Sequence, residues 1–347
     1  MGRPAARAHA ALRAGARPGG RALRQGRMKP HHPTLRLAAR IASLLFLLAV
    51  AVLLVHAART VDWTQVRAAI AGYAPHRLAL AGVLTAASYA LYCGYDVAAR
   101  RYAEHDLRHR HILPIVFVSY ALSMNIGAVL GGAGFRLRLY TRSGLSLGLI
   151  TRIIFFATVT NWTGYLLLAG VLFARRTLAL PPGWRLGVDG LQVLGVAMLG
   201  VVAAYLVACR LMHGRIFHVR GHHFRLPSLH LALLQLAMST GNWMLMAGIV
   251  HVLLPGGIAY PEVLAVLLLG AVAAAAVHMP AGIGVLEAVF VALLDGRAPR
   301  AEILAAVLTY RAFYYLLPLA VAMVVYAGLE MRRHRQGGRR TMHGDRA

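Results

Sequence analysis

The sequence predicts an all-α polytopic integral membrane protein with about seven transmembrane helices and two re-entrant helical hairpins. Hydrophobic residues make up 59% of the 347-residue chain and charged residues only 14%, whereas soluble domains carry about a quarter charged residues. Long uncharged runs recur along the chain, and arginine clusters separate them. Apolar side chains this abundant need the bilayer as a second apolar solvent, and the same composition excludes a disordered chain.

The basic charge balance favours a membrane partner over nucleic acid. The formal net charge is +26, and Lys29 is the only lysine. The arginines stand in short clusters between apolar runs, a pattern typical of cytoplasmic loops held against lipid headgroups. We therefore expect membrane lipids, anionic phospholipid above all, as partners, and no nucleic acid. Cys93 and Cys209 lie in separate apolar stretches, so we expect buried free thiols and no disulfide.

The chain begins with a basic segment rich in Ala, Gly and Pro. Because such a segment cannot bury a core, residues 1–36 are expected to form a disordered tail. Met28 offers a second candidate start, and residues 1–27 can equally be an extension that the native protein lacks. Residues 37–330 are then the transmembrane domain, and residues 331–347 a basic cytoplasmic tail.

Spanning helices are expected where an uncharged run approaches the roughly twenty residues that cross the hydrocarbon. The first such run resembles a signal peptide, but its length and the membranous sequence after it favour an uncleaved anchor. The runs lie at 41–58, 78–95, 153–174, 190–209, 229–254 and, broken only by Arg311, 302–329.

Two further apolar stretches are interrupted by Gly and Pro. Residues 111–135 end in a glycine cluster, and HMPAGIGVLE at 278–287 interrupts the stretch 263–294. Broken backbone at membrane depth survives only where protein or water satisfies its polar groups. We therefore expect re-entrant hairpins over 111–140 and 263–294.

The distribution of arginine sets the expected orientation. With a cytoplasmic N-terminus and hairpins that enter from opposite sides, the C-terminus is also cytoplasmic. The basic stretches 100–111, 136–142, 210–225 and 332–340 then all face the cytoplasm, as the positive-inside rule requires. Glycine-broken segments in corresponding places of two halves indicate an inverted-repeat transporter with its site near the bilayer midplane.

Charged residues inside a membrane are costly and usually functional. In the first hairpin, Gly131, Gly132 and Gly134 would let backbone amides approach an anion, and Arg136 and Arg138 would bind phosphate or carboxylate. The backbone is expected to bend back at these glycines. The alternative is that both arginines merely end a helix at the cytoplasmic headgroups.

The second hairpin carries an acidic candidate. Gly282 and Gly284 allow a turn, and Glu287 falls on the first turn of the helix that follows, where the helix macrodipole stabilises a carboxylate. Glu287 can pair with Arg311 or with Arg136. Such a pair is either purely structural or part of a headgroup contact or gate.

The remaining polar residues give weaker signals. Asn161–Trp162 and Asn242–Trp243 lie in separate runs, where hydrogen bonds between helices explain them at least as well as substrate contact. The histidines lack metal-site spacing, and no nucleophile–base arrangement suited to catalysis stands out. We therefore expect no metal, no cofactor and no enzymatic activity.

Two motifs carry a family resemblance. SYALSMNIGAVLGGAGFRLRLYTRSGLS (119–146) and HMPAGIGVLEAVFVALL (278–294), with the following AEILAAVLTYRAFYYLLPL (301–319), resemble the transmembrane region of bacterial lysylphosphatidylglycerol synthetases. The chain is most similar to their stand-alone, flippase-like branch over about residues 37–330. Ala133 and Ala281 depart from the usual GGE and PGG forms of the two motifs.

The resemblance implies a bacterial inner-membrane protein that moves phospholipid or a related lipid-linked headgroup between leaflets. No aminoacyl-transfer domain follows the last apolar run, so synthesis of a lysyl-lipid by this chain is not expected. In the leading hypothesis Arg136 and the 131–134 amides hold a lipid phosphate, Arg311 lies near the midplane and Glu287 acts as counter-ion or gate. The alternative is a non-catalytic membrane partner of an envelope-lipid or glycosyl-transfer enzyme, which docks through the loop 210–230.

Overall fold

The structure is a computed structural model that describes residues 63–178, 187–212, 215–219, 222–277 and 284–344. The chain divides into two units, 1–48 and 49–347, and every described residue belongs to the second unit. The predicted tail 1–36 and the apolar run 41–58 lie outside the described residues.

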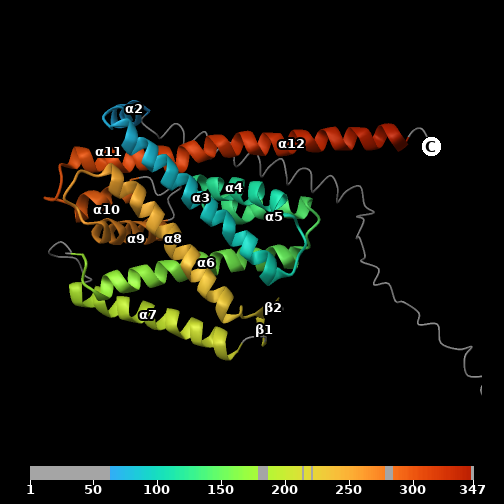
Figure 1. The fold of residues 1–347 in the computed structure, drawn as a ribbon, viewed down its shortest axis with the longest axis horizontal. Helices are drawn as coiled ribbons and strands as arrows, with labels where there is room; N and C mark the ends of the chain where they lie inside the picture. The colour runs from blue at the N-terminus through green and yellow to red at the C-terminus, as the bar shows by residue number, and fades with distance from the viewer. Residues whose placement is uncertain (1–62, 179–186, 213–214, 220–221, 278–283, 345–347) are drawn as a thin grey trace, which may run out of the picture. The chain divides into compact units, whose positions relative to one another are not determined.

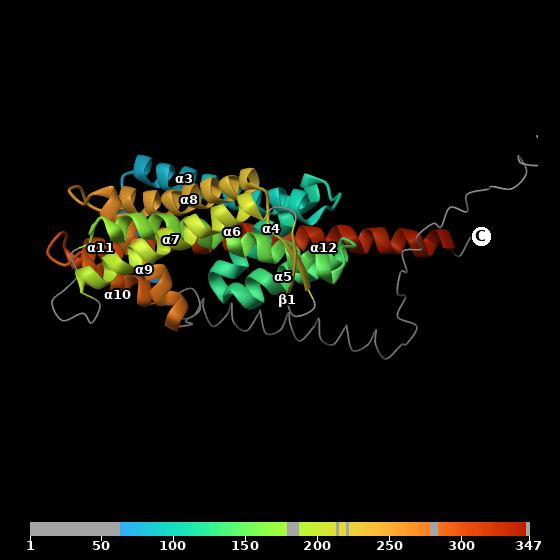
Figure 2. The same ribbon diagram turned by 90° about the horizontal axis from the view of Figure 1, so that it is seen from below.

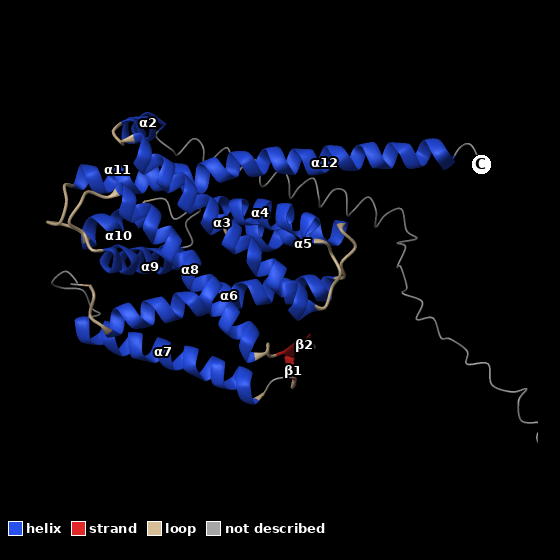
Figure 3. Cartoon of the chain, in the orientation of Figure 1, coloured by secondary structure: helices blue, strands red, loops and turns tan. Residues whose placement is uncertain are grey.

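Helices form almost all of the described secondary structure (Figures 1 and 3). Two short segments, η1 and η3, have the wider turns of a π-helix. The elements are α2 (Trp63–Ala71), α3 (Pro75–Ala103), α4 (His109–Ile126), η1 (Ala128–Gly134), α5 (Phe135–Arg142), α6 (Leu147–Ala174), α7 (Val188–Leu211), β1 (Ile216–Val219), β2 (His222–Arg225), α8 (Leu229–Leu253), α9 (Tyr260–Val277), α10 (Val285–Leu293), α11 (Arg300–Arg311), η3 (Ala312–Leu316) and α12 (Leu317–Gly344).

Five of the described helices are long and apolar enough to cross a bilayer: α3, α6, α7, α8 and the continuous helix Arg300–Met331. Each contains one of the predicted apolar runs, which confirms a helical, multi-pass membrane fold. One face of α7 exposes valines, with Val193 at 70% and Val196 at 58%. An apolar face of this kind is expected to contact lipid.

One departure from an all-helical chain is the antiparallel pair β1–β2, which hydropathy did not predict. It lies within the basic stretch 210–225 and places Phe217 opposite Phe224. Figure 3 shows the two strands beside the ends of α7 and α8. Pairing of the two strands satisfies backbone groups of this stretch.

Small residues allow the long helices to pack closely. A Cβ atom at Gly164 of α6 would overlap Ser239 and Thr240 of α8, and one at Gly195 of α7 would overlap Ala174 of α6. Ser88 of α3 donates a hydrogen bond to the Asn242 side chain of α8 (2.7 Å). Close backbone approach and interhelical hydrogen bonds are the main forces that associate helices in lipid.

The first predicted hairpin is present as α4, η1 and α5. Its turn lies at Gly127, which has a φ of +96°, and not at Gly131–Gly134 as expected. Gly131 and Gly132 already belong to the returning arm, where added Cβ atoms would meet Leu122 and Ser123 of α4. These glycines therefore serve close packing of the two arms.

The second predicted hairpin is present as α9 and α10. Gly270 of α9 packs against Leu286 and Val289 of α10, since a Cβ there would lie 2.8 Å from Leu286 Cδ1. Gly284, at the start of α10, has a φ of +82°. Gly282 lies outside the described residues.

The two hairpins lie toward opposite ends of the long helices. In Figures 1 and 2, α9 and α10 lie at the end where α11 begins, whereas α4 and α5 lie alongside α12, nearer the strands. This arrangement suits two hairpins that enter a membrane from opposite sides.

Candidate functional site

A buried ion pair joins the first hairpin to α3. The Arg136 guanidinium donates from Nη2 to Asp96 Oδ1 (3.1 Å) and from Nε to Asp96 Oδ2 (3.2 Å). Tyr140, one helical turn after Arg136, donates its hydroxyl to Asp96 Oδ2 (2.8 Å). The Asp96 side chain is fully buried and that of Arg136 is 5% exposed. The pair neutralises both charges where neither could otherwise remain ionised.

Aromatic rings surround this pair. The Arg136 guanidinium carbon lies 5.5 Å from the centre of the Tyr92 ring, and Tyr92 in turn stacks on Tyr120 with ring centres 3.5 Å apart. An aromatic face attracts a guanidinium and leaves its edge free for hydrogen bonds. Arg136 is therefore held by the face of one ring and by a bidentate carboxylate.

A second ion pair joins the second hairpin to the last spanning helix. Arg311 donates from Nη2 to Glu287 Oε2 (3.0 Å), and their side chains are 10% and 17% exposed. Glu287 also accepts the backbone N–H of Gly284 (3.0 Å), so it closes the first turn of α10. Of the two partners the sequence allowed for Glu287, the structure selects Arg311.

Arg311, at the end of α11, and the π-helical segment η3 that follows it contact both hairpins. Tyr315 lies under the Arg311 guanidinium, 5.7 Å from its ring centre, and its carbonyl accepts from Asn125 at the end of α4 (3.1 Å). The hydroxyls of Tyr314 and Tyr120 lie 2.7 Å apart. Residues 311–315 thus contact one hairpin through a charge and the other through hydrogen bonds. π-Helical turns inside long helices often mark functional sites.

The other predicted residues of the first hairpin, three glycines and Arg138, do not take part in its ion pair. Gly131 and Gly132 are buried and Gly134 is half-buried, and the Gly131 N–H already donates to the Gly127 carbonyl (3.0 Å). Arg138 is half-buried. Two positions after Arg136, it points to a different face of α5.

The polar–aromatic pairs of α6 and α8 act between helices. Trp243 Nε1 donates to the Asn161 carbonyl (3.2 Å), as does the Ser239 hydroxyl (2.8 Å). Asn242 accepts from Ser88, whereas Trp162 is 44% exposed. Cys93 and Cys209 are buried free thiols, as expected. Among the described residues, no group of three His, Cys, Asp or Glu side chains is placed to hold a metal ion.

Sequence reasoning missed Asp96 and the tyrosines around it. The predicted apolar run ends at Tyr95 and the basic stretch begins at Arg100, so Asp96 belongs to neither. The available signal was an acidic residue directly after an apolar run, since helical periodicity carries α3 through it to Ala103. Its partner lies 40 residues away, and spacing alone does not reveal such a distant contact.

The helical spans and the two charged hairpins define a multi-pass membrane protein with ion pairs buried among its helices. The chain belongs to the lysylphosphatidylglycerol synthase TM region family, whose model matches residues 40–322. With several spanning helices and an inner-membrane relative, it is an inner-membrane protein.

Two relatives extend over most of the chain. The inner membrane protein YbhN of Escherichia coli (strain K12) is 42% identical over 304 residues, which cover 87% of this chain and 96% of that protein. The uncharacterized protein slr0712 of Synechocystis is 31% identical over 277 residues, covering 79% of this chain and 86% of that protein. The region that the family model matches contains both hairpins.

Proposed function

We propose that the protein is a flippase-like transporter that moves a phospholipid, or a related lipid-linked headgroup, between the leaflets of the inner membrane. One observation carries the proposal: each hairpin bears a charge that is neutralised by a neighbouring helix, and both hairpins contact residues 311–315. Charges kept within apolar surroundings normally mark a transport path or relay. The action is transport and not enzymatic catalysis.

The ion pairs suggest how a lipid phosphate would be handled. A phosphate offers a guanidinium the same bidentate geometry as a carboxylate. It would replace Asp96 on Arg136, or Glu287 on Arg311, and the released carboxylate would take up a proton or the cationic part of the headgroup. The phosphate therefore exchanges partners along the path and never lies unpaired in hydrocarbon. A gradient of ions or lipid would supply the driving force.

The proposed topology follows the two hairpins. They re-enter from opposite sides of the bundle of spanning helices, with both chain termini in the cytoplasm. Helix α3 with the α4–α5 hairpin corresponds to α8 with the α9–α10 hairpin, as in an inverted repeat. The hydrogen bond from Ser88 of α3 to Asn242 of α8 supports the proposed pairing of the two halves. Transport would switch the packing of both hairpins against η3.

Reconstitution of the full chain with labelled phospholipid tests the proposal. Arg136→Ala and Glu287→Ala should each slow lipid movement by at least about tenfold, because each removes a charge-assisted hydrogen-bond partner. Arg176→Ala is the matched control, since its ion pair with Asp189 is exposed (53% and 86%). Unchanged movement in both hairpin variants, with folded protein in the vesicles, would exclude this mechanism.

The second candidate function is that of a membrane partner for an envelope-lipid or glycosyl-transfer enzyme. The observation in its favour is that part of the basic loop 210–230 folds into β1–β2. The outer edges of a two-stranded sheet can pair with another chain. Under this hypothesis, replacing the loop by a Gly–Ser linker would abolish co-purification of one enzyme and leave lipid movement unchanged.

A further inference from the structure

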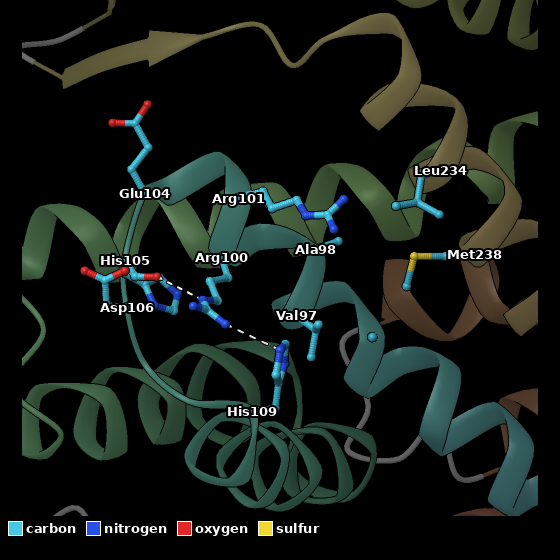
Figure 4. Close-up of a pocket in the computed structure, with 11 residues that line it drawn as sticks. Val97, Ala98, Arg100, Arg101, Glu104, His105, Asp106, His109, Leu234 and Met238 are labelled. Carbon is cyan, nitrogen blue, oxygen red and sulfur yellow. Dashed lines mark hydrogen bonds between the residues drawn. The ribbon is translucent and has the colours of Figure 1, made fainter.

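A cavity of about 730 Å³ lies where α3 ends, the chain turns into α4, and the first half of α8 passes (Figure 4). It is separate from the two ion pairs described above. On the proposed topology, its basic stretch 100–111 faces the cytoplasm. Cavities of this size accommodate small molecules or lipid headgroups.

The cavity wall carries two arginines, Arg100 and Arg101. None of the ion pairs between described residues includes Arg100 or Arg101. Arg100 donates to the His105 carbonyl (3.2 Å) and lies 3.4 Å from His109 Nε2. These contacts orient the Arg100 guanidinium without placing a carboxylate on it, so it can bind a phosphate group.

A buried histidine provides a second, independent indication of a ligand. His105 lines the cavity and is only 6% exposed. Its Nδ1 accepts the backbone N–H of Leu107 (3.3 Å), which places the neutral ring's proton on Nε2. His105 Nε2 is buried and has no hydrogen-bond partner among the described residues. A buried donor without an acceptor is costly, and a ligand oxygen would satisfy it.

Across the cavity, the lining residues change from apolar to basic to acidic. Figure 4 shows Leu234 and Met238 on one side and the carboxylates of Glu104 and Asp106 on the other. The two arginines lie between them. Glu104 is exposed and reaches Arg225 only at 3.8 Å, so its carboxylate stays accessible to a cation. The same order occurs in a phospholipid with an aminoalcohol headgroup, which runs from acyl chain to phosphate to ammonium.

We infer that this cavity binds a zwitterionic glycerophospholipid with a phosphoethanolamine headgroup. The arginines and His105 take the phosphate, Glu104 and Asp106 face the ammonium, and the first acyl carbons lie against Leu234 and Met238. The two acids balance the two arginines, which favours a zwitterion over an anion. The inference rests on the proposed transport function and names its substrate class.

The cavity adjoins the buried ion pair of the first hairpin. Arg100 and Asp96 are four residues apart in α3 and therefore lie on the same helix face, one turn apart. A phosphate bound by Arg100 would have Arg136, the partner of Asp96, as its next cationic site. The cavity is thus the loading site from which a headgroup reaches the hairpin.

Binding of defined lipids to the purified full chain tests the inference. The readout is native mass spectrometry in detergent, with phosphatidylethanolamine and phosphatidylglycerol of the same acyl chains. Wild-type protein should prefer phosphatidylethanolamine. The double variant Arg100→Ala with Arg101→Ala should bind it at least about tenfold more weakly. Glu104→Gln with Asp106→Asn should reduce the preference over phosphatidylglycerol by about fivefold. Equal binding of both lipids by wild-type protein would overturn the headgroup assignment.

Further measurements distinguish a lipid site from a simple anion site, and further variants control for misfolding. Soluble phosphoethanolamine should bind at least about tenfold more weakly than the lipid, since it lacks the acyl carbons that contact the apolar wall. Leu234→Trp fills the cavity without changing its charge and should also block the lipid. Arg176→Ala, far from these residues in the sequence, should bind as wild type.

Failure of the loading site and failure of the proposed transport function give different results. Normal phosphatidylethanolamine binding in Leu234→Trp and in the arginine double variant overturns the loading site, whatever the transport assay gives. Specific binding to the cavity with no lipid movement in reconstituted vesicles supports the site and overturns the transport proposal.

Discussion

Arg136 and Asp96, which are 40 residues apart in sequence, form a two-pronged ion pair that fixes the returning arm of the first hairpin to α3. Both side chains are almost completely buried. A pair of this kind orients a guanidinium and prepares it for an anion, because the aspartate already occupies the place that a phosphate would take.

Removal of one partner of this pair should destabilise the protein strongly. Arg136→Ala or Asp96→Ala leaves the other charge buried and uncompensated, which costs about 3–5 kcal/mol in comparable cases. The double variant should lose clearly less than the sum of the two single losses, because it leaves no unpaired charge. The free energies of unfolding of the two single variants and the double variant would be measured in detergent. Additive losses would contradict the pairing.

Gly131 tests the close contact between the hairpin arms. A Cβ at this position would overlap the Leu122 carbonyl, so Gly131→Ala should destabilise the protein by about 1–3 kcal/mol, as overpacking does. Gly148→Ala is the matched control, since Gly148 is exposed and has open space around it. Its stability should be unchanged or slightly raised. Equal unfolding midpoints for the two variants would argue against the tight hairpin.

The geometry of Arg311 should matter as much as its charge. Arg311→Lys keeps the positive charge but loses the planar fork that contacts Glu287 and lies over Tyr315. Because an ammonium cannot replace a guanidinium at a bidentate or stacked site, lipid movement should fall by about tenfold. The measurement is the transport rate in vesicles at matched protein content. Wild-type rates in Arg311→Lys would assign the residue a purely electrostatic role.

The pH dependence of stability should report on His105. Burial and the nearby Arg100 lower the pKa of His105 below its ordinary value of 6.5, against the opposing effects of Asp96 and Asp106. The folded state then binds fewer protons than the unfolded chain, so this contribution is complete above pH 6.5 and is lost as the pH falls below that value. Unfolding midpoints should therefore drop between about pH 7 and about pH 5.

His105→Gln provides the control for this pH effect. Glutamine cannot titrate, so the variant should show a shallower decrease in its unfolding midpoint over the same range. A decrease as steep as that of wild-type protein would assign the effect to other groups.

The sequence predicted the fold class and both hairpins because apolar runs and glycines determine structure within their own segment of the chain. Five of the predicted runs lie in helices that are long and apolar enough to span a membrane, and Gly284, at the start of α10, has a positive φ. The turn of the first hairpin was placed too late, since Gly127 was not distinguished from the cluster that follows it. Positive φ and tight packing both require glycine, and sequence alone does not separate these two causes.

The candidate site was only partly predictable. Arg136, Glu287 and Arg311 stand out because charges in apolar runs are rare, and the Glu287–Arg311 pair was one of two pairings considered. Asp96, Tyr140 and the contacts of η3 depend on helix packing between segments far apart in sequence. The π-helical turn at Ala312–Leu316 has no sequence signature that spacing could reveal.

The most direct test of the account locks the first hairpin to η3. The side-chain nitrogen of Asn125 lies 3.1 Å from the Tyr315 carbonyl, so cysteines placed at both positions, in a background without Cys93 and Cys209, can be joined by a short, reducible bis-methanethiosulfonate cross-linker. Lipid movement by reconstituted protein would be measured before cross-linking, after cross-linking confirmed by mass spectrometry, and after reduction. The account predicts that the cross-link stops lipid movement and that reductant restores it. Undiminished movement through fully cross-linked protein would contradict it.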